Sequence, residues 1–253
     1  MYSKIIASFV ITLVFISGCN RLPYTSAKDG ELKRLDTTWA HTNAKIDALI
    51  APYKAQIDSQ MNVVVGYSAT ELIKARPESP MGNGIADLLY RFGVNTIGND
   101  IDLCVMNYGG LRAPIPRGPI TVGRIFEIMP FDNTLVVVTI NQVELNQLAG
   151  HILVKGGEPF AGAEHVSVTN FKSGPRFVFT DSTLYTKQSY RILTSNYLAD
   201  GGDSYTMFIG KQREETNTLI REALISGFSN TSNDNPFTAK IDGRIIWDPN
   251  RDE

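Results

Sequence analysis

The order of its apolar segments constrains the fold of this chain more than any other feature of the sequence. Short β-type runs alternate with stretches that carry apolar residues at helical spacing, and several runs follow one another with only short loops between them. The run NTLVVVTI at 133–140 is rich in β-branched residues, which favour strands. This order predicts an α+β fold, a single compact domain with mixed β-sheets layered with helices, rather than a doubly wound parallel sheet.

The same periodicities predict where individual elements lie. Strands are expected at 61–68, 101–106, 133–140, 165–169, 176–179, 190–195 and 244–247. Helices are expected at 32–60 with a break or kink near Pro52, after Ser79 as an N-cap with Pro80 as the first helical residue, near Thr121 or Val122, at 143–153 and at 214–226.

The first residues of the sequence read as a targeting signal. Lys4 precedes an apolar run at 5–16, which is too short for a comfortable membrane span. The run ends in ISGC, which resembles the bacterial lipobox, so we expect cleavage before Cys19 and lipidation of that cysteine. An ordinary secretory signal with an incidental cysteine is the alternative. The predicted organisation is a lipoprotein signal peptide at 1–18, a tether at 19–30 and a domain at 31–253, anchored to a membrane outside the cytoplasm.

Composition excludes several classes of function. The formal net charge is -2 and charged residues make up 20% of the chain, so no basic face for nucleic acid is expected. Neither a GxSxG elbow nor a P-loop occurs, and none of the three histidines stands at close metal-ligand spacing. If Cys19 is acylated, Cys104 is the remaining cysteine. Its apolar neighbours predict a buried core residue rather than a nucleophile.

Three separated segments combine turn residues with an aromatic ring, an arginine or an amide. They are NYGGLR at 107–112, MPFDN at 129–133 and NYLADGGDSY at 196–205. Each follows or borders an apolar element, and the ends of such elements are where binding residues are commonly displayed. The three segments are therefore the candidates for a binding site.

The residue types in these segments suit a nucleotide. The Arg112 guanidinium is a planar donor fork for phosphate or carboxylate. Phe131 and Tyr197 could clamp one flat ring between them, and Asn133 could read a base edge. The Asp203 carboxylate could accept hydrogen bonds from two vicinal sugar hydroxyls. The alternative is ordinary turns, in which the two rings belong to the core and Arg112 is a solvated surface charge.

Taken in order, these segments resemble the C-terminal domain of the 5′-nucleotidase family. The family pattern runs N-x-G-G-[IV]-R, G-x-I-T, P-F-x-N and N-[FY]-x-A-x-G-G-D-[GS]-[FY]. This chain has NYGGLR, GPIT at 118–121, PFDN at 130–133 and NYLADGGDSY, preceded by ESPMGN at 78–83. The resemblance covers roughly residues 60–248. The substrate-binding residues that it implies are Asn107, Arg112, Phe131, Asn133, Tyr197 and Asp203, with Arg76 as the nearest match to a further family arginine.

Enzymes of this family also carry an N-terminal metallophosphoesterase domain that holds two metals, and no part of this chain resembles it. We therefore expect no catalytic residue and no cofactor in this chain, which is not expected to be active alone. Divalent metals are expected on a separate metallophosphoesterase chain, which would complete hydrolysis of the bound nucleotide. The alternatives are a nucleoside-binding lipoprotein without a catalytic partner and a structural surface protein without any ligand.

Overall fold

The computed structural model describes residues 43–168 and 174–246. The chain divides into two compact units, Met1–Leu49 and Ile50–Glu253. The predicted signal peptide, Cys19 and the tether lie outside the described residues. Of the break or kink predicted near Pro52, no break occurs, because helix α2 (Ala44–Met61) continues through that residue. Residues 32–42 of the predicted helix lie outside the described residues.

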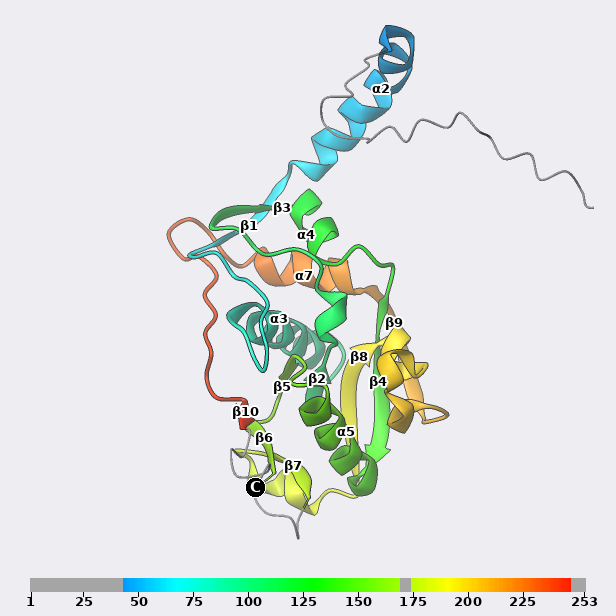
Figure 1. The fold of residues 1–253 in the computed structure, drawn as a ribbon, viewed down its shortest axis with the longest axis vertical. Helices are drawn as coiled ribbons and strands as arrows, with labels where there is room; N and C mark the ends of the chain where they lie inside the picture. The colour runs from blue at the N-terminus through cyan, green and yellow to red at the C-terminus, as the bar shows by residue number, and fades with distance from the viewer. Residues whose placement is uncertain (1–42, 169–173, 247–253) are drawn as a thin grey trace, which may run out of the picture. The chain divides into compact units, whose positions relative to one another are not determined.

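The second unit is built on a mixed five-stranded sheet with the order β5-β2-β8-β4-β9 (Figure 1). Strands β2 and β8 pair in parallel, and the other neighbours pair antiparallel. The bounds are β5 Phe160–Ala161, β2 Leu103–Val105, β8 Ser189–Ser195, β4 Thr134–Asn141 and β9 Arg213–Leu219. The mixed pairing confirms the α+β prediction.

Side chains on the two faces of this sheet enter two separate cores. Along β4, Leu135 and Val137 join one cluster while Val136 and Val138 join the other, as the two-residue period of a strand requires. The first cluster lies under α3 (Pro80–Thr96), α4 (Val122–Ile128) and α7 (Ile220–Phe228). The second lies under α5 (Gln142–Val154) and two short strands, β6 (His165–Val168) and β7 (Pro175–Val178).

Two smaller sheets complete the described part of the unit. Strand β1 (Val64–Ser68) pairs antiparallel with β3 (Gly118–Thr121), and β10 (Ile245–Ile246) pairs with β6 beside β7. No helix within residues 43–168 and 174–246 is both long and apolar enough to cross a membrane.

Most predicted elements are confirmed, and one is wrong in part. Ser79 caps α3 by accepting a hydrogen bond from the Gly82 N–H, and Pro80 is the first helical residue. The helix predicted at 214–226 is instead strand β9 up to Leu219, followed by α7. The cause is tertiary: β9 pairs along the edge of β4, and the Thr216 hydroxyl donates to the Leu135 carbonyl at 2.6 Å.

Candidate functional site

The three turn segments meet at one end of the central sheet. The parallel strands β2 and β8 both end there, and the antiparallel strand β4 between β8 and β9 begins there. NYGGLR follows β2, MPFDN precedes β4, and NYLADGGDSY follows β8. Strand direction and sheet order therefore bring segments that are far apart in the sequence to one edge.

These segments surround a pocket of about 290 Å³. Its lining consists of Asn107, Gly109, Gly110, Arg112, Phe131, Asn133, Tyr197 and Asp203. All the predicted substrate-binding residues except Arg76 are in this set. Their contact with a ligand remains a prediction.

The two aromatic rings are displayed at the surface and are not part of the core. Phe131 and Tyr197 are each 43% exposed, whereas core aromatics such as Tyr205 are fully buried. Tyr197 belongs to the short helix α6 (Asn196–Ala199), which Ser195 caps by accepting from the Leu198 N–H. Exposed aromatic surface on two different loops of one pocket suits the stacking of a flat ring.

Asp203 is held in place by hydrogen bonds to its carboxylate and by an unusual backbone. Its φ of 50° lies in the left-handed region, within the 3₁₀ turn η3 (Gly202–Ser204). One carboxylate oxygen accepts from the Asn107 side-chain amide at 2.5 Å, and the other accepts from the Tyr197 hydroxyl at 3.0 Å. The bond to Asp203 raises the pKa of Tyr197. Each oxygen keeps a further lone pair with which it can accept from a ligand hydroxyl.

Among the residues that line the pocket, Arg112 carries the positive charge. Arg112 donates to the Gly109 carbonyl at 3.3 Å, and its guanidinium carbon lies 6.0 Å from the centre of the Phe131 ring. Burial, and then the nearby charges of Arg112 and Arg76, lower the pKa of Lys74. The Glu158 charge raises that pKa again and pairs with Arg76, so Arg112 is the cation that the pocket offers to an anionic ligand group.

Arg76 does not line the pocket. Its guanidinium lies 4.5 Å from the centre of the Tyr108 ring and pairs with Glu158 at 3.3 Å. Glu158 is buried and accepts a hydrogen bond from the Tyr108 N–H. Burial raises the pKa of Glu158, so the Arg76 charge compensates part of the cost of keeping that carboxylate ionised. Arg76 therefore contacts the NYGGLR turn at Tyr108, directly and through Glu158, from outside the pocket lining.

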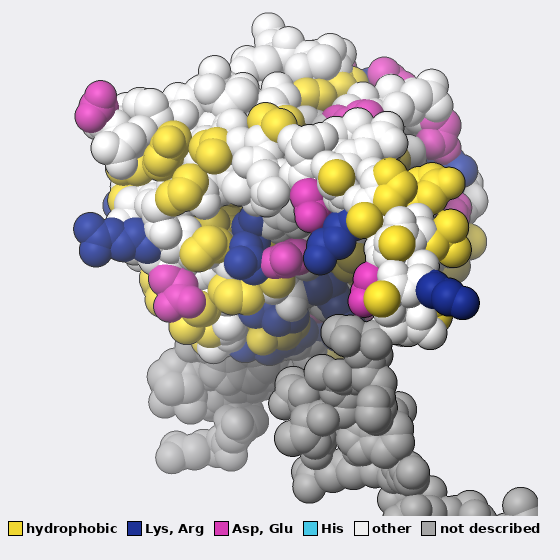
Figure 2. Space-filling view, turned by 90° about the horizontal axis from the view of Figure 1, so that it is seen from above, with side chains coloured by type: hydrophobic (Ala, Val, Ile, Leu, Met, Phe, Trp, Pro, Cys, Tyr) yellow, Lys and Arg dark blue, Asp and Glu magenta, His cyan; other side chains and the backbone are white. Residues whose placement is uncertain are grey.

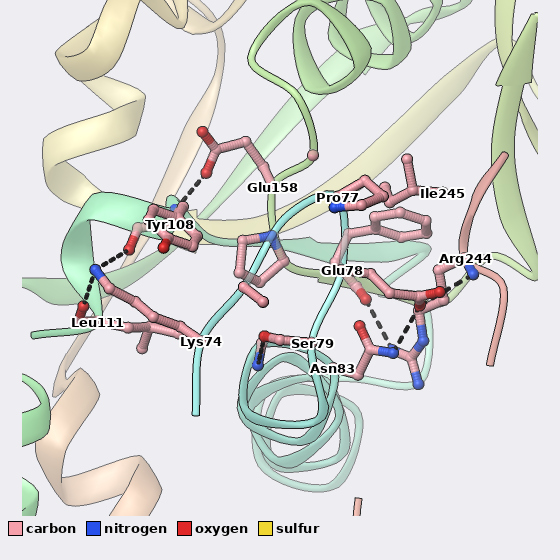
Figure 3. Close-up of a pocket in the computed structure, with 15 residues that line it drawn as sticks. Lys74, Pro77, Glu78, Ser79, Asn83, Tyr108, Leu111, Glu158, Arg244 and Ile245 are labelled. Atoms are coloured by element: carbon pink, nitrogen blue, oxygen red, sulfur yellow. Dashed lines mark hydrogen bonds between the residues drawn. The ribbon is translucent and has the colours of Figure 1, made fainter. Parts of the chain in front are cut away.

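Lys74, which the sequence did not single out, anchors the same turn. Figure 3 shows its ammonium donating to the carbonyls of Tyr108 and Leu111, at 3.3 and 2.7 Å. The cleft drawn there holds about 10 Å³, which is room for roughly one water molecule and not for a nucleotide. In the sequence, Lys74 is marked only by standing two residues before Arg76. The two residues that Lys74 contacts lie 34 and 37 positions further along the chain, so the local sequence does not indicate these contacts.

Three further features of the described residues bear on function: possible metal ligands, Cys104 and the distribution of surface charge. Within residues 43–168 and 174–246, no cluster of three or more His, Cys, Asp or Glu could hold a metal ion. Cys104 is fully buried, as predicted, and burial raises the pKa of its thiol. On the face in Figure 2, Lys and Arg side chains lie among Asp and Glu side chains instead of forming one large basic field.

Gly202 gives a local test of the Tyr197 position. A Cβ on Gly202 would lie 2.5 to 2.6 Å from atoms of the Tyr197 ring, which would have to move outward. We expect Gly202→Ala to weaken the binding of a stacked base about tenfold with a small effect on thermal stability, because the displaced ring loses its hydrogen bond to Asp203 but leaves no cavity in the core. Gly150→Ala is the matched control, since its Cβ would only touch Pro175 at 3.4 Å. Equal affinity in both variants would contradict the assigned role of Tyr197.

Comparison with known proteins gives consistent matches. Residues 63–158 match the family model described as 5′-nucleotidase, C-terminal domain. The chain is 29% identical over 213 residues to the trifunctional nucleotide phosphoesterase protein YfkN of Bacillus subtilis, covering 76% of this chain and 14% of that protein. It is 24% identical over 200 residues to the cell wall protein Lmo0130 of Listeria monocytogenes, covering 66% of this chain and 24% of that protein.

Among solved structures, a 5′-nucleotidase precursor from Thermus thermophilus superimposes with a TM-score of 0.61 at 26% identity, covering 79% of this chain and 42% of that one. The chain thus spans less than half the length of each of these three relatives.

Proposed function

We propose that this chain, whose residues 63–158 match the family model for the C-terminal domain of 5′-nucleotidases, binds a nucleoside or nucleotide as the substrate-recognition half of a 5′-nucleotidase. The observation that carries the proposal is the convergence of three motif segments on one pocket of about 290 Å³. The name of the B. subtilis relative, a nucleotide phosphoesterase, agrees with this class of ligand.

In this proposal, each side of the pocket binds one part of the ligand. The base stacks between Phe131 and Tyr197, and the Asn133 amide contacts its edge. Asp203 accepts hydrogen bonds from the ribose hydroxyls, and its own bonds to Asn107 and Tyr197 fix the direction of its carboxylate. Arg112 contacts the phosphate through charge-assisted hydrogen bonds.

Arg112 can be separated from the base site by ligand choice. We expect Arg112→Met to weaken AMP binding roughly tenfold to a hundredfold while adenosine binding changes little, because only AMP carries the anion that the guanidinium contacts. Arg117→Met is the control, since Arg117 is also exposed but does not line the pocket. A loss of affinity that is the same for adenosine and AMP would argue against the phosphate role.

Hydrolysis of the bound nucleotide, we further propose, uses divalent metals on a separate metallophosphatase chain. The thin supply of histidines in the sequence supports this division of labour. The ISGC sequence supports lipidation at Cys19 and attachment to a membrane outside the cytoplasm, and the match to a Listeria cell wall protein agrees with that location.

A turnover assay tests the division of labour. The purified chain is incubated with AMP and Mg²⁺, Mn²⁺ or Zn²⁺, with and without the candidate metallophosphatase, and phosphate release is measured. We expect release only when the second protein is present, and release that falls when Phe131 is replaced by alanine. Robust turnover by the purified chain alone would reject the proposal that catalysis needs a partner.

A further inference from the structure

Arg221 occupies an electrostatically unfavourable position. It is the second residue of α7, where the helix dipole disfavours a positive charge, and only 8% of its surface is exposed. Desolvation of a guanidinium costs free energy unless its donors are satisfied by well-placed acceptors. The contacts of this side chain must therefore compensate both the dipole and the loss of solvent.

Those contacts all lie on or beside the segment that carries Phe131. The Arg221 Nη1 donates to the Phe131 main-chain carbonyl at 2.9 Å, and its Nη2 pairs with the Asp132 carboxylate. The guanidinium carbon also lies 4.4 Å from the centre of the Phe126 ring, within the range of a cation–π interaction. Next to it, the Ile220 N–H donates to the Asn133 carbonyl at 3.0 Å. The start of α7 thus holds three consecutive residues, two of which, Phe131 and Asn133, line the pocket.

The same stretch is attached on its other side to the segment of the second ring. The Asn196 side-chain oxygen accepts from the Thr134 N–H at 3.1 Å, and Asn196 directly precedes Tyr197. Phe131 itself is 43% exposed, so neighbouring side chains enclose its ring only in part. The position of that ring therefore depends on its main chain, which Arg221 holds.

We propose that Arg221 is a positioning residue for the base site. It fixes the Phe131 main chain so that the two rings keep the separation that a base needs. This inference rests on the proposed function and deepens it. Arg221, which lies outside the pocket lining, then contributes to the affinity for the base. It does not contribute to the affinity for ribose or phosphate, because its contacts reach neither Asp203 nor Arg112.

A comparison of two ligands tests this role. AMP and ribose 5-phosphate, which lacks a base, are titrated calorimetrically into wild type, Arg221→Met, Arg221→Lys and the control Arg91→Met, an exposed arginine on α3. We expect Arg221→Met to raise the Kd for AMP about tenfold and that for ribose 5-phosphate less than twofold. Arg221→Lys should recover part of the loss because it keeps the charge and a donor. Arg91→Met should match wild type.

The outcomes separate the two claims. Unchanged AMP affinity in Arg221→Met, or an equal loss for both ligands, would overturn the positioning role. If wild type binds ribose 5-phosphate but shows no preference for AMP, or binds neither, the proposed nucleotide function fails and this role with it. If Arg221→Met does not fold, Arg221→Gln, which retains an amide donor for the Phe131 carbonyl, takes its place, and the same selective loss of AMP affinity is expected.

Discussion

Replacing Phe131 or Tyr197 by alanine is expected to weaken AMP binding about 5- to 150-fold in each case, because stacking of a base on one aromatic face contributes about 1–3 kcal/mol. Both rings line the pocket and are substantially exposed, so neither substitution opens a cavity in the core. Thermal unfolding should therefore change little in either variant. The affinities are measured by calorimetric titration with AMP.

The matched control for the rings is Tyr53→Ala. Tyr53 is a 67% exposed aromatic on α2 that does not line the pocket, so AMP affinity should be unchanged. Phe131→Leu and Tyr197→Leu keep apolar bulk without a π-face and should lose most of the same affinity. If the alanine and leucine variants of Phe131 and Tyr197 all kept wild-type affinity, the two rings would not clamp the base.

Replacing Asp203 by asparagine should have an effect of comparable size, but only for ligands with ribose hydroxyls. Hydrogen bonds to a charged group contribute about 1.5–3 kcal/mol each, so loss of the charge predicts a 10- to 100-fold weaker AMP complex. The same change should weaken 2′,3′-dideoxy-AMP binding less than threefold, because that ligand has no hydroxyl to donate. Titrating both nucleotides into both proteins gives the comparison.

Two further variants show whether Asp203 acts through the sugar or through the pocket frame. Tyr197→Phe removes the hydroxyl that donates to Asp203 but keeps the ring, and Asn107→Ala removes the other donor. We expect Tyr197→Phe to retain binding within a few-fold of wild type, since the base still stacks. If Asp203→Asn weakens the dideoxy nucleotide as much as AMP, the carboxylate holds the loop and not the ribose.

The candidate site could be predicted from the sequence because its residues stand at the ends of strongly marked strands. NYGGLR follows the buried run 101–106, and NTLVVVTI begins where PFDN ends. Strand direction then determines which element ends share a sheet edge, and the observed pairing of β2, β8 and β4 brings the three segments together. The order of the motifs indicates the family, and the pairing of the strands explains why the three segments meet.

The residues that contact the site from outside the pocket lining could not be predicted from the sequence, because each of them contacts a residue far away in the chain. Lys74 and Leu111 are 37 residues apart, and Arg221 and Phe131 are 90 residues apart. The prediction of a helix at 214–219 was wrong for a similar reason, since pairing with β4 outweighed local spacing. Arg76 stands just before ESPMGN in the sequence, whereas Glu158, with which it pairs, lies 82 residues further along the chain.

The central claim is that this pocket binds a nucleotide, and the most direct measurement is calorimetric titration of AMP into the wild-type chain and the double variant Phe131→Ala/Tyr197→Ala. The account predicts saturable binding to wild type with a Kd between about 1 μM and 1 mM, as expected for a two-sided stack with polar contacts, and no measurable binding to the folded double variant. A folded wild-type chain that releases no heat of binding, or a double variant that binds AMP equally well, would contradict it.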